Sequence, residues 1–325
     1  MTIRKLKGSS KTLSALGMGG FGLGGPFMRA DGSYLAYGEV SDEESIKTVH
    51  RAIELGVNIF DTADIYGVGR SEKVLGKALK EYRDDVVIAT KFGSVFEEGN
   101  PHTPDKKNTS PEYIRNAIES SMKRLQTDFI DIYQLHSSNH DPDDARKVQI
   151  RLEELVEEGL IGGYGWSTDD PKRMEIFTKS ENCNSVQYAM NILLHNDQMI
   201  QLCEKNNLIG LIRSPLASGI LTGKYNEHSN IAANHMLAGV DFSQERYKEI
   251  NMKLQKLKSL LKQDDRTLIQ GQLGYLMATS KTTIPIPGAK TVEQIEENAR
   301  TLEFGPLSKA LVDQINSLFA TIINK

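Results

Sequence analysis

Short runs of β-branched and apolar residues alternate with amphipathic stretches of helical period from about residue 40 to the end of the chain. After a first strand, strands are predicted at 57–60, 86–89, 129–133, 162–166, 185–188, 209–213 and 283–286. Helices are predicted from Ser41, at 71–82, from Ser110, at 144–158, 171–178, 197–205 and 292–302, and from about Ser308. Strands that alternate with helices in this way form a parallel sheet.

About eight strands in 325 residues favour a closed (β/α)8 TIM barrel over an open doubly wound sheet. No shift in composition marks a second domain, so residues 1–325 are predicted to form one barrel domain that ends in a C-terminal helix. Residues 3–14 are predicted to form an N-terminal hairpin that caps the barrel floor. Residues 222–243 have no clear period and are predicted to form a large loop after the seventh strand, where lids are common.

The composition of the chain argues against several classes of function. Lys and Arg number 39 against 43 Asp and Glu, a net charge of −4, which argues against a nucleic-acid or anionic-membrane partner. No apolar run approaches the roughly 20 residues that span a bilayer, and Met1–Lys5 leads into no signal-peptide core. Cys183 and Cys203 lack metal-ligand spacing, so a reducing, cytoplasmic setting is expected.

Four ionisable residues stand at the carboxyl ends of three predicted strands, where TIM barrels place their working groups. These residues are Asp61, Tyr66, Lys91 and His136. A tyrosine with a pKa of about 10 is a poor acid near neutrality, and an adjacent ammonium lowers that pKa. Together the four suit proton donation to a carbonyl oxygen: a Tyr acid, a Lys–Asp pair that tunes it, and a His that orients the carbonyl.

Three of the four also have a structural interpretation: Tyr66 as a loop tyrosine, Lys91 as a solvated charge and His136 as a satisfied buried histidine. A metal site at His136 and His140 is not expected, because the residues between them lie in a loop and no third ligand has recognisable spacing.

Two loops have the composition of a phosphate site. The glycine-rich segments 17–25 and 67–69 lack the Rossmann strand–turn–helix frame, so a barrel must hold a nucleotide through the loops after strands seven and eight. Small and hydroxyl residues at 214–224 end at Lys224. After strand eight, Lys290 precedes Thr291 and Gln294, whose spacing is that of a capping box at a helix N-terminus, as is that of Ser41 and Glu44.

These segments resemble, in order, the motifs of the aldo-keto reductase family, in its bacterial NADP-dependent form. The first is FDTADIYGVGRSE at 60–72, and the others lie at 89–93, 128–136, 165–168, 214–224, 286–290 and 296–298. The resemblance covers about residues 10–320. Departures are Gly20-Phe21-Gly22, where the family has Gly followed by Thr and Trp, Trp166 in place of a small aliphatic residue, and Met190 in place of Tyr; they leave the four candidate residues intact.

The resemblance implies NADP(H) bound across the barrel mouth and hydride transfer between nicotinamide and a small-molecule carbonyl or alcohol. It also implies a monomer as the default state, with an oligomer left open. It implies Tyr66 as general acid, Lys91 and Asp61 as its tuning pair, and His136 as the group that orients the carbonyl. By the same resemblance the cofactor contacts are Gly20, Phe21, Asp61, Ser167, Thr168, Gln187, Arg213, Ser214, Pro215, Leu216, Ser218, Gly219, Lys224, Gly288, Lys290, Gln294, Glu297 and Asn298.

Four functions remain open. The leading hypothesis is an NADPH-dependent reductase of aldehydes or ketones. The second is a sugar or aldose dehydrogenase that runs the reverse reaction with NAD(P)+. The third is a nucleotide-binding regulatory subunit of a membrane channel on the same barrel, and the fourth is a phosphate-binding lyase or isomerase, which predicts no nucleotide binding and no need for Tyr66.

Overall fold

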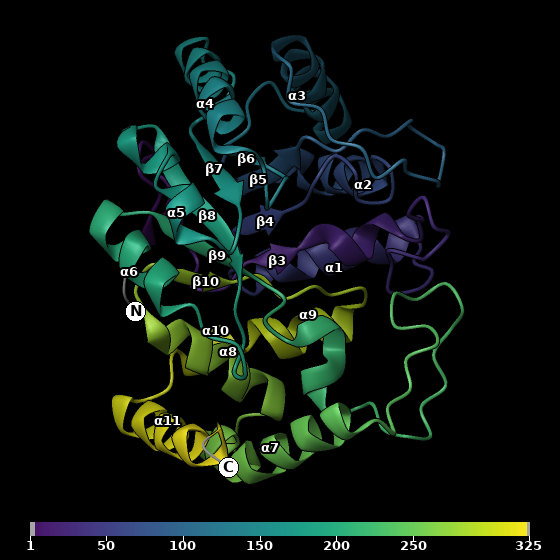
Figure 1. Ribbon diagram of the computed structural model, residues 1–325, viewed down its shortest axis with the longest axis vertical. Coiled ribbons are helices and arrows are strands. Elements are labelled where there is room, and N and C mark those ends of the chain that lie inside the picture. Colours follow the sequence, from purple (N-terminus) through teal and green to yellow (C-terminus); the bar gives the residue numbers. More distant parts are fainter. Residues whose placement is uncertain (1–3, 324–325) are drawn as a thin grey trace.

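The computed structural model describes residues 4–323 and contains one curled sheet of eight parallel strands with helices around it (Figure 1). The strands, in sheet order, are β3 (Met18–Gly19), β4 (Ile59–Asp61), β5 (Val87–Phe92), β6 (Ile132–Leu135), β7 (Tyr164–Ser167), β8 (Cys183–Ala189), β9 (Ile209–Arg213) and β10 (Thr283–Pro285). The sheet closes on itself, because Gly17 N donates to Pro285 O at 2.9 Å and Gly19 N donates to Pro287 O at 3.0 Å. The (β/α)8 prediction is confirmed.

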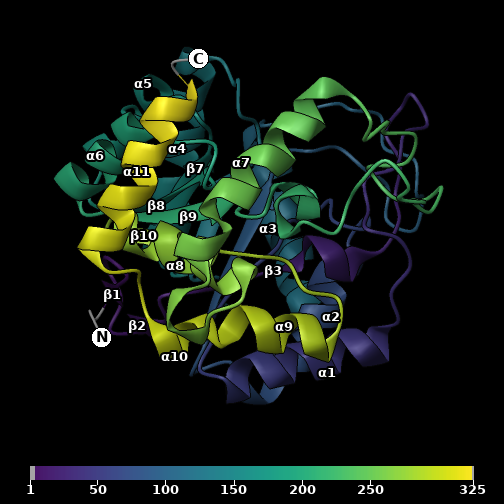
Figure 2. The ribbon, with the colours of Figure 1, turned by 90° about the horizontal axis from the view of Figure 1, so that it is seen from below.

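The helices surround the strands and cover their outer faces (Figure 1). They are α1 (Asp42–Glu54), α2 (Arg70–Leu79), α3 (Pro111–Leu125), α4 (Pro142–Glu157), α5 (Pro171–Met174), α6 (Asp197–Asn206), α7 (Glu245–Leu261), α8 (Leu268–Thr279), α9 (Val292–Ala299), α10 (Thr301–Phe304) and α11 (Lys309–Ile323). Five short 3-10 turns join them: η1 (Gly20–Gly24), η2 (Lys80–Tyr82), η3 (Phe177–Lys179), η4 (Ala217–Thr222) and η5 (Gln263–Asp265). α7, α8 and α11 pack together outside β9 and β10 (Figure 2). α7 and α8 were absent from the predicted elements.

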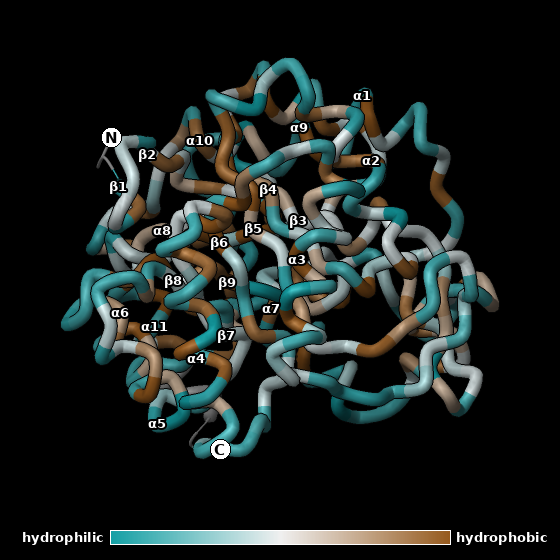
Figure 3. Tube along the Cα trace, turned by 90° about the horizontal axis from the view of Figure 1, so that it is seen from above, coloured by the Kyte–Doolittle hydropathy of each residue, from teal (hydrophilic) through white to brown (hydrophobic). Residues whose placement is uncertain are grey.

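Apolar residues concentrate around the strands, and the outer turns are mostly hydrophilic (Figure 3). One buried cluster fills the barrel interior near its floor: Leu6, Leu13, Ile59, Val87, Ala89, Ile132, Ile209, Leu211, Ile284 and Ile286. Within residues 4–323, no helix combines the length and the apolar character that a membrane crossing requires.

The predicted hairpin is present as β1 (Arg4–Lys5) paired antiparallel with β2 (Thr12–Leu13), and residue 3 lies outside the described residues. It contributes Leu6 and Leu13 to the interior cluster, so it closes the barrel floor as expected.

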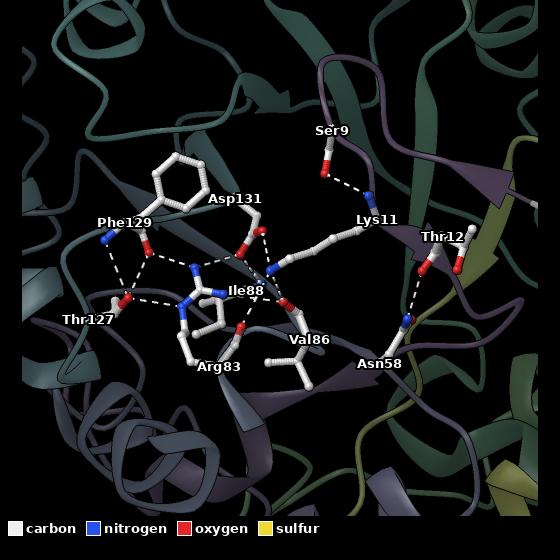
Figure 4. Close-up of polar contacts among 10 residues, drawn as sticks. All are labelled: Ser9, Lys11, Thr12, Asn58, Arg83, Val86, Ile88, Thr127, Phe129 and Asp131. Carbon is white, nitrogen blue, oxygen red and sulfur yellow. Dashed lines mark hydrogen bonds and ion pairs between the residues drawn. The ribbon is translucent and has the colours of Figure 1, made fainter. Parts of the chain in front are cut away.

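A buried carboxylate ties this hairpin to the barrel (Figure 4). Lys11 Nζ donates to Val86 O at 2.6 Å and to Asp131 Oδ1 at 3.1 Å. Arg83 forms an ion pair with Asp131 Oδ2 at 2.7 Å, and Ile88 N donates to the same oxygen at 3.0 Å. Asp131 is 2% exposed, so these donors compensate its lost hydration.

Residues 223–244 form no helix or strand, as predicted for the loop after the seventh strand. The loop has its own small core of Tyr225, Leu237 and Phe242, which packs with Tyr247 at the start of α7. It is joined to the segment before α1, since Met236 N donates to Ala36 O at 2.7 Å.

One of the two predicted capping boxes guides α1, but only half of it forms. Ser41 Oγ accepts from Glu44 N at 3.1 Å and caps the helix. The Glu44 carboxylate turns away and accepts from Val292 N of α9 at 3.3 Å. The reciprocal bond is therefore replaced by a contact that joins α1 to α9.

Candidate active site

The four candidate catalytic residues meet at the carboxyl end of the barrel. Asp61 is the last residue of β4, Lys91 lies in β5, and His136 directly follows β6. Tyr66 lies in the turn between β4 and α2. The registers of β4, β5 and β6 bring these segments side by side, and His136 N donates to Phe92 O at 2.8 Å. The sequence predicts that these residues lie at or just after strand ends, and the parallel arrangement of the strands brings those ends to one side of the barrel.

A buried ion pair organises the site. Lys91 Nζ lies 2.8 Å from Asp61 Oδ2, 2.6 Å from Thr62 O and 3.2 Å from Tyr66 Oη. Asp61 Oδ1 accepts from Gln187 Nε2 at 2.7 Å and Gln134 Nε2 at 3.4 Å. Lys91 is fully buried, and its three donor positions have three acceptors. The ammonium is thereby held in contact with the tyrosine hydroxyl.

Burial and charge act in opposite directions on the three groups. Burial lowers the pKa of Lys91, but the charges of Asp61 and Tyr66 outweigh it and raise that pKa above its ordinary value. The ammonium therefore stays protonated. Burial also raises the pKa of Tyr66, and the opposing effect of Lys91 does not cancel it. The predicted lowering effect of the ammonium on the Tyr66 pKa is therefore present, but burial exceeds it and the net pKa lies above its ordinary value, because a buried phenolate loses more hydration than one ammonium restores.

His136 faces the same space as Tyr66. The two rings have centroids 5.9 Å apart with planes at 83°. Burial, and then the charges of Lys91, Lys107 and Arg213, place the pKa of His136 well below its ordinary value. Its buried Nδ1 has no hydrogen-bond partner among the described residues. A proton on that atom would be unsatisfied, so the neutral ring carries its proton on Nε2.

Asp61, Tyr66 and His136 line a cavity of about 1580 Å³ at the barrel mouth. The volume exceeds the roughly 300–1,000 Å³ of a single drug-sized site, so it has room for more than one ligand. Most of the predicted cofactor contacts line this cavity: Phe21, Asp61, Ser167, Gln187, Arg213, Ser214, Pro215, Leu216, Ser218, Gly219, Lys224, Gly288, Lys290, Gln294, Glu297 and Asn298.

Two predicted contacts do not line the cavity. Thr168 is 1% exposed, and its hydroxyl donates to Ser138 O at 3.0 Å, so it supports the loop after β6. Gly20 is the first residue of η1, and an added Cβ there would meet Asp61 O and Ser71 Oγ, each at 2.9 Å. Its lack of a side chain lets η1 lie against β4, and the next residue, Phe21, meets Tyr66 edge to face with centroids 5.1 Å apart.

The loop after β9 has an unusual backbone. Ser214, Ala217 and Ser218 have φ of 56°, 46° and 57°, and Gly219 has φ of 88°. Positive φ in consecutive non-glycine residues is unfavourable and is typical of ligand-binding turns. The N–H groups of Ala217 and Gly219 are donated within the turn, to Ser214 O at 3.0 Å and Leu216 O at 2.9 Å. The groups of this loop that suit an anion are therefore the side chains of Ser214, Ser218 and Lys224, which line the cavity.

Two lysines without carboxylate partners line the same end of the cavity. Lys224 and Lys290 form no ion pair with any described residue. Burial, followed by the charge of Lys224, lowers the pKa of Lys290. Lys290 Nζ donates to Tyr37 O at 2.5 Å and Glu39 O at 3.3 Å. Two cations in one cavity without counter-ions fit an anionic ligand.

The second predicted capping box is also only half formed. Thr291 caps α9 by accepting from Gln294 N at 3.4 Å. The Gln294 side chain accepts from Lys290 N at 2.8 Å instead of Thr291 N. This contact fixes the backbone of Lys290. Near it, Asn298 Nδ2 donates to Gly288 O at 3.4 Å.

Arg213 ends β9 on the cavity wall, where its guanidinium forms an ion pair with Asp169. Asp169 itself is anchored, because its Oδ1 accepts from Ala189 N at 2.7 Å. Ser167 at the end of β7 and Gln187 in β8 complete this wall.

Several cavity residues were missed from the sequence. The unpredicted lining residues include Arg29, Tyr37, Ser94, Asp105, Lys107, Ser137, Asn139 and His235. They lie in loops that have no periodic pattern, and the only signal for Ser94 and Lys107 was their place in the loop after the strand that carries Lys91.

Comparison with known proteins defines the class. The sequence profile described as the aldo/keto reductase family matches residues 15–320, so the chain belongs to this family of oxidoreductases acting on carbonyl and alcohol groups. It is 27% identical over 318 residues to the uncharacterized oxidoreductase YqkF of Bacillus subtilis, covering 98% of this chain and 96% of YqkF. It is 29% identical over 326 residues to aldo-keto reductase yakc [NADP(+)] of Schizosaccharomyces pombe, covering 97% and 91%. The holo form of aldo-keto reductase AKR11C1 from Bacillus halodurans superimposes with a TM-score of 0.77 at 29% identity, covering 98% of this chain and 96% of that one.

Proposed function

We propose that this protein is an NADPH-dependent reductase of aldehydes or ketones in which Tyr66 is the general acid. The observation that carries the proposal is the contact of Tyr66 Oη with the buried Lys91 ammonium at 3.2 Å, at the wall of a cavity large enough for two ligands. No other tyrosine hydroxyl among the described residues forms a hydrogen bond with a lysine ammonium. Membership of an oxidoreductase family supports the same chemistry.

The residues of the cavity fit a phosphorylated dinucleotide. The hydroxyl side chains of the loop after β9 and Lys224 suit a pyrophosphate, and Lys290 suits a further phosphate such as the ribose 2′-phosphate. The relative yakc carries NADP(+) in its name. Glu297 and Asn298 offer polar groups to an adenine, and Ser167 and Gln187 offer them to a carboxamide. The planar guanidinium of Arg213, which is paired with Asp169 at the cavity wall, provides a surface for the nicotinamide ring.

When bound, NADPH supplies a hydride to the carbonyl carbon of the substrate. Tyr66 gives its hydroxyl proton to the carbonyl oxygen, so that hydride and proton together yield the alcohol. The Lys91 ammonium then stabilises the phenolate at the contact that it already makes. Asp61 holds that ammonium in place, and the amides of Gln187 and Gln134 hold Asp61.

His136 serves as a neutral hydrogen-bond donor. Its Nε2 proton points the carbonyl oxygen toward Tyr66, because its depressed pKa excludes the imidazolium at neutral pH. The raised pKa of Tyr66 keeps the acid protonated through the same range. The site therefore holds one proton ready for transfer and a second that only orients.

The direct test measures NADPH oxidation with 4-nitrobenzaldehyde by the wild type, with alcohol formed in equal amount, beside Lys290→Met. We expect Lys290→Met to raise the Kd of NADPH by about tenfold or more and to change that of NADH by less than about threefold, because a lost hydrogen bond between charged groups costs about 1.5–3 kcal/mol. Lys281→Met, an exposed lysine outside the cavity, is the matched control and should change neither.

Two results would contradict the proposal. Tight NADPH binding without turnover of any carbonyl compound in a broad panel would refute the reductase. Equal losses of NADPH and NADH affinity in Lys290→Met would show that Lys290 does not contact the 2′-phosphate.

A further inference from the structure

We propose that Lys107 binds a carboxylate on the substrate, so that the preferred carbonyl compounds are aldehydes or ketones that carry this group away from the reacting carbonyl. The inference rests on the proposed reductase function and concerns the substrate end of the same cavity.

The position of Lys107 is fixed by backbone contacts to the end of β5. Val95 N donates to Lys106 O at 2.8 Å, and Asn108 N donates to Gly93 O at 3.1 Å. Ser94 and Lys107 form an antiparallel bridge. The segment is thereby attached to the strand that carries Lys91, and Lys107 is placed beside the proposed reaction centre.

The Lys107 ammonium lies at the cavity wall next to His136. Its Nζ donates to Ser94 Oγ at 2.6 Å and to His136 O at 2.9 Å. Both acceptors are uncharged, and an ammonium has three donors, so one remains for a ligand. The residue lines the cavity together with Tyr66 and His136.

Charge balance distinguishes Lys107 from the other cations at this end of the cavity. Lys91 is paired with Asp61, and Arg213 is paired with Asp169. Lys107 has no carboxylate within 4.0 Å among the described residues, and neither has Arg29, which lines the cavity further out. Lys107 therefore places a positive charge beside the reaction centre that no direct ion pair within the described part of the chain neutralises.

Two carboxyl groups act on Lys107 through space without pairing with it, Asp64 and Asp105. Asp105 lies at the rim, where its Oδ2 accepts from Ala30 N at 3.2 Å. Asp64 is 1% exposed, and its Oδ1 has no hydrogen-bond partner among the described residues. Burial, and then the charge of Glu72, raise the pKa of Asp64 well above its ordinary value, which favours its neutral form. Neither group replaces an anionic ligand at the ammonium.

The remaining wall suits the carbon body of such a substrate. Phe21, Phe27, Leu35 and Ile65 give an apolar surface beside Tyr66. A molecule whose carbonyl meets Tyr66 and His136 and whose carboxylate meets Lys107 would place its hydrocarbon part against these side chains. The specificity therefore comes from one charged contact across an apolar pocket.

The test compares kcat/KM for 4-carboxybenzaldehyde and 4-nitrobenzaldehyde, which share planar shape and size and differ in charge. Wild type, Lys107→Gln, Lys107→Arg and Lys106→Gln are assayed with saturating NADPH. Lys106 is the matched control, because it neighbours Lys107 in the chain and is exposed as Lys107 is, but does not line the cavity.

We expect Lys107→Gln to lower the carboxylate-to-nitro ratio of kcat/KM by about tenfold or more, the order of one hydrogen bond between charged groups. Lys107→Arg should retain most of the ratio, and Lys106→Gln should leave it at the wild-type value. Added salt should reduce the ratio in the wild type and not in Lys107→Gln.

A Lys107→Gln variant that loses both activities equally would show that Lys107 only supports Ser94 and His136, and would overturn the inference while the reductase stands. An unchanged ratio would overturn it in the same way. Absence of turnover of either aldehyde by the wild type would overturn the proposed function, and this inference with it.

Discussion

Lys91→Met removes the cation that neutralises the buried Asp61 carboxylate. Asp61 is 3% exposed and keeps only the amides of Gln187 and Gln134 as donors in the variant. The folded variant must either bury an unpaired charge or take up a proton. Taking up the proton costs about 1.4 kcal/mol for each pH unit above the ordinary aspartate pKa of about 3.9, which limits the penalty to roughly 4 kcal/mol at pH 7.

The destabilisation therefore depends on pH, and its sign follows from the direction of the shift. Burial raises the pKa of Asp61, and in the wild type Lys91 opposes that rise. Without Lys91 the folded pKa rises further, so the folded state binds a proton that the unfolded state releases. Stability is retained below the unfolded pKa of about 4 and is lost progressively as pH rises toward the raised folded pKa.

The assay is urea unfolding of the wild type, Lys91→Met and Asp61→Asn/Lys91→Met at pH 5, 6, 7 and 8. We expect Lys91→Met to lose about 3–4 kcal/mol relative to the wild type at pH 7 and about 1–2 kcal/mol at pH 5. The double variant has no carboxyl group at this position, so its loss should not vary with pH by this route. Parallel pH curves for Lys91→Met and the wild type would refute the account of the pair.

Two further predictions concern the barrel floor and the pH profile. Asp131→Asn should lower the free energy of unfolding in urea by about 2–3 kcal/mol, because Lys11, Arg83 and Ile88 N lose a buried acceptor charge. The control Glu43→Gln breaks an exposed pair with Lys47 and should lower it by less than about 1 kcal/mol. Equal losses in the two variants would contradict the role of Asp131. The depressed pKa of His136 predicts no inflection in kcat/KM near the ordinary histidine pKa of about 6.5, and the raised pKa of Tyr66 predicts that reduction declines only above about pH 10. An inflection in the pH profile of kcat/KM near pH 6.5 that disappears in His136→Asn would show that the imidazole titrates there, and would contradict this prediction.

The barrel could be predicted from the sequence because its strands are short, apolar and separated by helices with clear caps. β9 falls at the predicted residues 209–213, and Ser110 caps α3 as Pro111 at its first turn suggested. α8 escaped prediction because apolar residues surround it on nearly all sides, so it has no amphipathic period. α7 was also not predicted. It follows a loop without any hydrophobic pattern, and its many polar residues obscured the spacing of its buried Leu254, Leu257 and Leu261.

The part of the candidate site that could be predicted from the sequence is the set of polar residues at the ends of the strands. Asp61, Tyr66, Lys91 and His136 do converge, since parallel strands end at one edge. The net effect on the Tyr66 pKa could not be foreseen, because it depends on how deeply the ring is buried. Lys107 could not be identified as a binding residue from the sequence, because the argument for it is that no described carboxylate pairs with it. Only the three-dimensional arrangement shows this.

The most direct test of the central claim is Tyr66→Phe assayed for NADPH affinity and for turnover in the same preparation. The ring and its edge-to-face contact with Phe21 remain, and only the hydroxyl that contacts Lys91 is removed. We predict a Kd for NADPH within about threefold of the wild type and a kcat lowered by about 10²–10⁴-fold, the range that a positioned general acid contributes. Turnover within about threefold of the wild type would contradict the assignment of Tyr66 as the proton donor.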